Sequence, residues 1–170
     1  MGGITNTIDL GRLGLTSGEG ASRNASVEVE PVELGGQSYT ARGAVTDARL
    51  DVSRMTTGYA LRLRYGVRLE GPCMRCLEDA ADQLSIDARE VDQPGGGDDL
   101  RSPYLDGEEL DLKAWARDAL VLALPVQIRC TADCRGLCSV CGANLNEEPG
   151  HVHEREPDGR WAKLSELKFD

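Results

Sequence analysis

The distribution of six cysteines constrains the fold of this 170-residue chain more than any other feature. Four of them lie in the stretch CTADCRGLCSVCGANLN, between Cys130 and Asn146. Within it, Cys138 and Cys141 form a C-x-x-C that is followed at once by Gly142. A metal knuckle has this pattern, because a tight turn points two thiolates at one ion and glycine tolerates the left-handed conformation after the second cysteine. The sequence therefore predicts a metal knuckle near the C-terminal end.

A second C-x-x-C, far upstream, supplies the remaining two cysteines, and the chain holds only two histidines. Together these give eight soft or borderline ligands, enough for two closed tetrahedral sites. The shortest connections define two sets. The bridging cluster would comprise Cys73, Cys76, Cys130 and Cys134. The local cluster would comprise Cys138, Cys141, His151 and His153.

Three alternatives remain open from the sequence alone. One ordinary zinc ribbon would join the two C-x-x-C units around a single ion and leave Cys130, Cys134 and the histidines free. The cysteines could also be reduced thiols without metal, or a redox dithiol. A redox C-x-x-C typically lies near a βαβ unit, and this sequence does not predict one. No ligand set leaves an open position, and no H-E-x-x-H or Ser-His-Asp arrangement is present. We therefore expect one or two structural zinc ions and no enzymatic activity.

The charge and composition limit the environment and the partners. The net charge is −10 with a pI of about 4.7, so bare nucleic acid is repelled at long range and a basic protein is attracted. Aromatic residues make up only 4%, which predicts a core of aliphatic side chains stapled by metal. Neither a membrane span nor a signal peptide is evident, so we expect a cytoplasmic protein, in which paired cysteines are typically metal ligands rather than disulfides.

Alternation of apolar and polar residues predicts several strands. One contains Val27 and Val29, after a loop over residues 16–24. The runs 44–52 and 61–69 predict a long antiparallel hairpin, and another strand is expected around residues 84–91. The first C-x-x-C falls in the connection between two strands, where a knuckle belongs.

A helix is predicted from about Asp111 to Leu124, with Asp111 as the N-cap. Its expected buried stripe is Leu112, Trp115, Ala116, Ala119, Leu120 and Ala123. Strands followed by one helix, without βαβ alternation, predict an α+β fold: an antiparallel, partly closed sheet, one main helix and a cysteine-rich zinc-knuckle C-terminal region. We expect residues 1–129 to form the sheet and helix core. Residues 130–170 would form a metal-binding segment packed on it, with Trp161 in a final short helix over residues 160–167.

A cationic ridge follows one face of the hairpin. It comprises Arg62, Arg64, Arg68 and Arg75, with Arg89 on the next strand as an extension. Arginine can hold phosphates in a fork, so the ridge is a weak candidate for RNA binding. The competing interpretation is a solvated strand face on which the arginines pair with Asp47, Asp51 and Asp87.

These motifs, in this order, resemble the bacterial YceD family. The resemblance rests on CMRCLE after an alternating strand, ELDLKAWARDALVLALP, C-x3-C-x-GLC-x2-CGANLN and the terminal DGRWAKLSELK. All six cysteines match the family's cysteine positions. After Asn146 the chain departs from the pattern, since many relatives have a further C-x-C where this chain has His151-x-His153. Both arrangements preserve the number of ligands.

The resemblance implies a small cytoplasmic protein needed for normal accumulation of large-subunit ribosomal RNA, with no catalytic residues to carry over. We expect a ribosome-assembly factor whose partner is precursor ribosomal RNA, a basic ribosomal protein, or both. The alternative is a zinc-knuckle interaction module that serves another complex.

Overall fold

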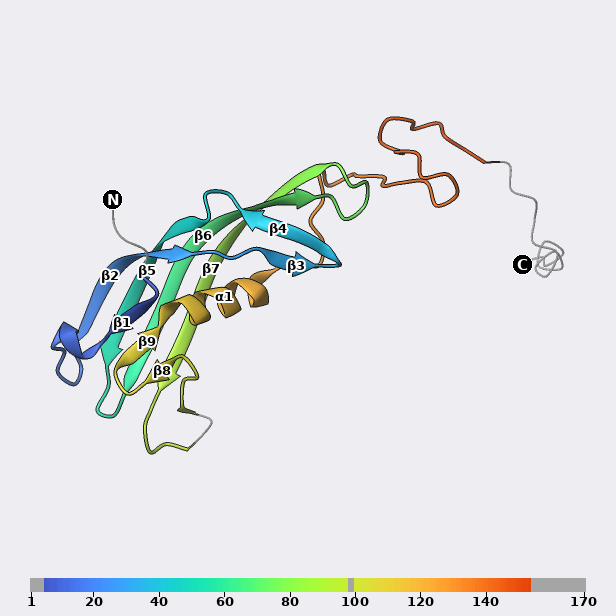
Figure 1. The fold of residues 1–170 in the computed structure, drawn as a ribbon. Coiled ribbons are helices and arrows are strands. Elements are labelled where there is room, and N and C mark those ends of the chain that lie inside the picture. The colour runs from blue at the N-terminus through green and yellow to red at the C-terminus, as the bar shows by residue number, and fades with distance from the viewer. Residues whose placement is uncertain (1–4, 98–99, 154–170) are drawn as a thin grey trace, which may run out of the picture.

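A computed structural model describes residues 5–97 and 100–153 of the chain (Figure 1). The chain forms a sheet of six strands, a smaller sheet of three strands, a 3-10 helix (η1, Gly11–Leu13) and one α-helix (α1, Leu112–Ala123). The strands are β1 (Thr7–Asp9), β2 (Gly20–Glu28), β3 (Val32–Leu34), β4 (Gln37–Ala41), β5 (Val45–Arg54), β6 (Tyr59–Pro72), β7 (Asp79–Asp92), β8 (Leu105–Asp106) and β9 (Glu109–Asp111).

The large sheet is built around β6, which pairs antiparallel with β5 and β4 and with β7. Alternate residues of β6 from Tyr59 to Leu69 are buried, while the intervening arginines face outward. The hairpin predicted over residues 44–69 is therefore confirmed as β5 and β6, with Leu50 opposite Leu63. The first C-x-x-C lies in the turn from β6 to β7, as expected.

The prediction of a partly closed sheet was wrong. β2 pairs only with β5 and β7 pairs only with β6 among the described residues, so the two outer strands do not meet. Barrel closure requires that the first and last strands pair, and this sheet stays open.

The expected loop over residues 16–24 was partly wrong, because β2 already begins at Gly20. Gly20 lies opposite Ser53 and Asn24 opposite Arg49, so the long neighbour β5 supplies the backbone partners. A polar sequence suits this end of an edge strand, where residues 22–24 are exposed.

The helix α1 packs on the buried face of the large sheet and was predicted correctly at both ends within one residue. The Asp111 carboxylate accepts a hydrogen bond from the Ala114 amide at 2.9 Å, which makes Asp111 the N-cap. The predicted stripe is buried except for Ala123, which is exposed because the helix end runs out past the core. The strands β1, β9 and β8 form the small sheet at the start of the helix.

Residues 130–137 lie against the turn at the end of the large sheet, and residues 138–153 extend away from it as irregular chain (Figure 1). The predicted helix over residues 160–167, with Trp161, lies outside the described residues. Among the helices of the described part, none has the length and apolar character needed to cross a membrane.

Candidate metal centres

The first C-x-x-C forms a tight turn between β6 and β7. The Leu77 amide donates to the Cys73 carbonyl at 2.9 Å, and the Arg75 amide donates to the Cys73 Sγ at 3.5 Å. Leu77, directly after the second cysteine, adopts a left-handed conformation with φ 66°. These are the turn, the N–H···S contact and the backbone conformation that a metal knuckle would need.

The second C-x-x-C repeats this geometry bond for bond. The Gly142 amide donates to the Cys138 carbonyl at 2.9 Å, and the Val140 amide donates to the Cys138 Sγ at 3.4 Å. Gly142 has φ 77°, the left-handed conformation expected of it from the sequence. Two segments that are far apart in the chain therefore form the same knuckle.

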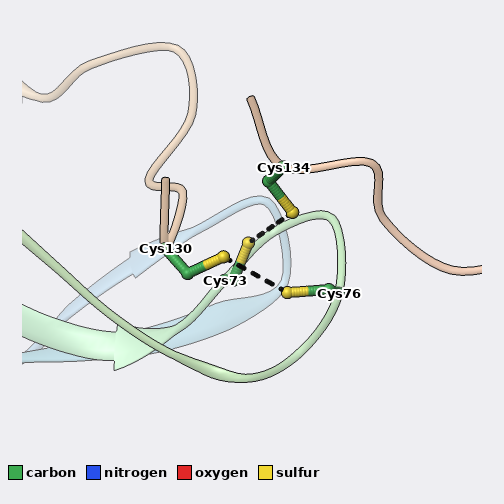
Figure 2. A group of neighbouring side chains, drawn as sticks. All are labelled: Cys73, Cys76, Cys130 and Cys134. Carbon is green, nitrogen blue, oxygen red and sulfur yellow. Dashed lines mark hydrogen bonds between the residues drawn. The ribbon is translucent and has the colours of Figure 1, made fainter. Parts of the chain in front are cut away.

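The bridging cluster brings four thiols together at the end of the sheet (Figure 2). The Sγ atoms of Cys73 and Cys134 are 3.7 Å apart, and those of Cys76 and Cys130 are 3.5 Å apart. A tetrahedral zinc with bonds of about 2.3 Å would separate its sulfurs by about 3.8 Å. A disulfide would need about 2.05 Å, so these thiols are free and spaced for one ion.

Burial and backbone contacts fix the bridging cluster to the core. Cys73, Cys76 and Cys134 are buried and Cys130 is half-buried. On the far side of the turn, the Met74 amide donates to the Ile128 carbonyl at 2.9 Å. The segment after α1 is thus held against the first knuckle by a backbone hydrogen bond.

The first cysteine of each knuckle favours its thiolate. Burial opposes ionisation of Cys73, but backbone amides led by that of Arg75 overcome it and lower the pKa to about 6. The amides of Cys141 and Val140 lower the pKa of Cys138 to about 6 as well. Metals bind the thiolate form, so both turns prepare a ligand near neutral pH.

The local cluster gathers its ligands within a short, more exposed segment. The Cys141 Sγ lies 3.2 Å from His151 Nε2 and 3.3 Å from His153 Nε2, and the two Nε2 atoms are 3.0 Å apart. A tetrahedral S2N2 site would give edges of about 3.4–3.8 Å, and the observed separations are slightly shorter. All four ligand atoms lie within 4.8 Å of one another, with Cys138 as the fourth.

Among the described residues, these two clusters are the groups whose ligand atoms could hold a metal ion. The structure thus brings together the two sets that the shortest sequence connections indicate, and it does not join the two C-x-x-C units as a single ribbon would. That these side chains bind metal stays a prediction.

Two positioning residues, Asn146 and Glu148, escaped the sequence analysis. The Asn146 side-chain amide donates to the Cys134 Sγ at 3.5 Å, and its carbonyl accepts from the Arg135 amide at 2.7 Å. Glu148 contacts the second ring nitrogen of His151 at 2.9 Å, which leaves Nε2 directed into the cluster. Only the position of Asn146, soon after the second knuckle, hinted at such a role.

The arginine ridge is engaged with acidic neighbours. The ion pairs are Arg62 with Asp87, Arg64 with Asp51, and Arg68 with Glu70. Arg62 makes a two-point contact with its partner, at 2.7 and 2.6 Å. The Arg75 guanidinium donates to the Arg135 carbonyl at 3.4 Å. Pairing of this kind accounts for the ridge within the protein, and its RNA contact stays a prediction.

The fold and the two clusters define a small α+β protein with a C-terminal cysteine-histidine segment whose side chains could hold metal. A family model described as large ribosomal RNA subunit accumulation protein YceD matches residues 61–168. The chain belongs to the YceD family.

The relatives support this assignment. The chain is 31% identical over 170 residues to uncharacterised proteins of Mycobacterium tuberculosis and Mycobacterium bovis, covering 95% of this chain and 80% of each relative. It is also 31% identical over 61 residues to the chloroplastic YCED homolog 1 of Arabidopsis thaliana, named as a large ribosomal RNA subunit accumulation protein, covering 36% of this chain and 19% of that one. No solved structure gives a significant match.

Proposed function

We propose that this chain is a non-catalytic cytoplasmic factor for the accumulation of large-subunit ribosomal RNA, acting during ribosome assembly. The observation that carries the proposal is the family match over residues 61–168, which spans most of β6, all of β7, the helix and both knuckles. The named relative from Arabidopsis thaliana points to the same process.

Each cluster holds one structural zinc ion in this proposal. Thiolates and imidazoles are the ligands that zinc prefers, and four protein ligands leave no open position for a substrate or a catalytic water. The zinc in the bridging cluster would tie the β6–β7 turn to the segment that follows α1. The zinc in the local cluster would shape residues 138–153 into a defined surface.

The acidic chain favours a basic ribosomal protein as one partner, since the net charge is −10. Precursor ribosomal RNA is the other partner, and the arginine ridge is where it would contact the sheet. An RNA phosphate there would compete with the acidic neighbours for Arg62 and Arg64.

Removal of the gene from its host tests the function directly. We expect the ratio of large-subunit to small-subunit ribosomal RNA to fall, and re-expression of the intact chain to restore it. An unchanged ratio in the deletion strain would refute the proposal. Pull-down from lysate, with and without ribonuclease, then identifies the partner: recovery of ribosomal proteins or precursor RNA supports assembly, whereas recovery of an unrelated complex alone supports the interaction-module alternative.

Metal analysis of protein purified without added zinc tests the role of the clusters. Two equivalents of zinc per chain are expected, and less than one would rule out the two-site version. For the arginine ridge, replacing Arg62, Arg64 and Arg68 with serine is expected to abolish RNA retention. Unchanged retention would remove the ridge from the proposal.

A further inference from the structure

The outer edge of β7 is open for hydrogen bonding over its central part. Cys73 and Glu78 form a hydrogen-bonded pair at the turn, with the Cys73 amide donating to the Glu78 carbonyl at 2.7 Å. Since hydrogen-bonded and non-hydrogen-bonded pairs alternate along an antiparallel ladder, even-numbered residues of β7 bond to β6 and odd-numbered ones face away. The amides of Ser85, Asp87 and Arg89 make no hydrogen bond within the described residues.

A hollow of about 490 Å³ runs along this same edge, between β7 and α1. Six consecutive residues, Ser85–Glu90, line one wall, so the hollow opens on the strand edge itself. Trp115, Ala119 and Leu122 of the helix line the other wall. Leu122 is 87% exposed, although the helix that carries it is otherwise amphipathic and packed on the sheet. An open strand edge beside an apolar hollow is what strand addition requires.

The charges along β7 indicate what would bind there. The strand carries five acidic residues and one basic residue: Asp79, Asp82, Asp87, Glu90, Asp92 and Arg89. Asp87 is paired with Arg62 and Asp92 with Arg101, but Asp82 and Glu90 have no ion pair among the described residues. Edge strands are often protected by lysine or proline, and β7 contains neither. The edge thus repels nucleic acid and attracts cationic peptide.

We propose that the edge of β7 between Ser85 and Arg89 binds an extended, basic segment of a partner protein as an added antiparallel or parallel strand. The segment would exchange backbone hydrogen bonds with the odd-numbered residues of β7. The residues of the bound segment that lie opposite Ile86 and Ala88 would point their side chains into the hollow toward Leu122. These side chains must be apolar. Lysine or arginine side chains at the ends of the segment reach Asp82 and Glu90, which lie on the same face of the sheet as Ile86 and Ala88. Basic side chains at the alternate positions lie on the opposite face, beside Asp87. The partner is therefore a chain of alternating apolar and basic residues.

This inference rests on the proposed function only in naming its class of partner, a basic protein. A binding assay with purified protein tests it without any measurement of ribosomal RNA. If the peptide does not bind, this inference is refuted, but the proposed role in ribosomal RNA accumulation is not. If deletion of the gene leaves the ribosomal RNA ratio unchanged, the proposed function is refuted, but binding at the β7 edge is not.

The probe is a short acetylated and amidated peptide of alternating lysine and isoleucine, titrated into the full chain and followed by fluorescence anisotropy and NMR amide exchange. We expect saturable binding that weakens with added salt, and slowed exchange of the amides of Ser85, Asp87 and Arg89. A peptide with proline in place of alternate lysines cannot pair and is expected not to bind. A peptide with glutamate in place of lysine is expected to bind far more weakly.

Two exposed apolar residues provide a matched pair of variants. Leu122→Gln removes the apolar wall of the hollow and is expected to weaken peptide binding about tenfold. Val126→Gln changes a residue that is 89% exposed and does not line the hollow, so binding is expected to be unchanged. Both sites are exposed, and neither change is expected to unfold the protein.

Equal binding by both variants, binding of the proline peptide, or unchanged exchange at Asp87 would each overturn the proposal. Sedimentation of the peptide-free protein as a dimer, with the same amides already protected, would also overturn it, because the edge would then pair with a second copy. Displacement of the peptide by an RNA oligomer from these amides would assign the surface to RNA instead.

Discussion

Replacement of Gly142 by alanine isolates the backbone contribution of the second knuckle. Gly142 has φ 77°, and a Cβ built there meets no atom within 4 Å. The change therefore causes no clash, and its only cost is holding an L-residue in the left-handed region, about 1 kcal/mol. The local cluster lies in irregular, largely exposed chain, so the proposed metal would be the main stabiliser of the turn, and the cost would fall on metal affinity. We expect the Kd of this site to rise about fivefold.

Cobalt titration of the full chain in competition with a chelator measures this effect. Cobalt in a site with four sulfurs and cobalt in a site with two sulfurs and two nitrogens absorb differently, so the two clusters can be followed separately. The bridging cluster is expected to keep its affinity in the variant. Gly150→Ala is the matched control, because a Cβ there also meets nothing and its φ lies outside the left-handed region. Equal affinities for the two variants would refute the argument from backbone conformation.

Two further predictions concern the sheet. The Ser22 hydroxyl, with Arg49 and Arg64, lowers the pKa of Asp51 from 3.8 to about 2. The stabilising contribution of the Asp51 carboxylate is therefore complete above about pH 4 and is lost as the pH falls toward 2. Urea unfolding is expected to show that Asp51→Asn lowers the free energy of unfolding by about 1–2 kcal/mol at pH 5. At pH 2 the variant and the parent are expected to be nearly equally stable. Tyr39→Phe removes a buried hydroxyl that donates to the Pro72 carbonyl at 2.7 Å, and calorimetry is expected to show a Tm lower by about 3 °C.

Each of these predictions has a matched control variant. Asp47→Asn changes a neighbour on the outer face of β5 whose contact with the Ser26 hydroxyl is 3.4 Å, and we expect a smaller effect at pH 5. If Asp51→Asn lowered the free energy of unfolding equally at pH 5 and pH 2, the proposed link between the pKa of Asp51 and stability would be wrong. For Tyr39, the comparison is Tyr104→Phe, whose hydroxyl reaches the partly exposed Asp118 at 3.1 Å. An equal decrease in Tm for Tyr39→Phe and Tyr104→Phe would contradict the argument that burial of the Tyr39 hydroxyl sets the cost.

The hairpin, the helix and the grouping of ligands could be predicted because each has a local signal. The alternation from Leu61 to Leu69 sets one face of β6 toward the core, and Asp111 marks the start of α1. The two clusters followed from counting ligands and joining the shortest connections. The two turns share one geometry because it depends only on residues within each turn. The C-x-x-C pattern specifies those residues, so the geometry could be predicted.

The features that were missed depend on distant partners. Gly20 belongs to β2 only because Ser53 of β5 lies opposite, and nothing near Gly20 indicates this. Whether the sheet closes depends on the relative positions of its two outer strands, and the sequence of one strand alone does not determine these positions. Leu77 takes the left-handed conformation that Gly142 takes in the other knuckle, and a leucine gives no hint of it. Asn146 reaches Cys134 through the fold of its own loop.

The two clusters differ in the length of chain that separates their ligands. The ligands of the local cluster span residues 138–153, so that site can assemble as soon as this short stretch is complete. The bridging cluster joins Cys73 to Cys134, and β7, β8, β9 and α1 lie between them. Closing this long loop carries the larger entropy cost, and it must wait for those elements. During synthesis the bridging cluster therefore closes only once the helix exists, and its closure marks a finished core.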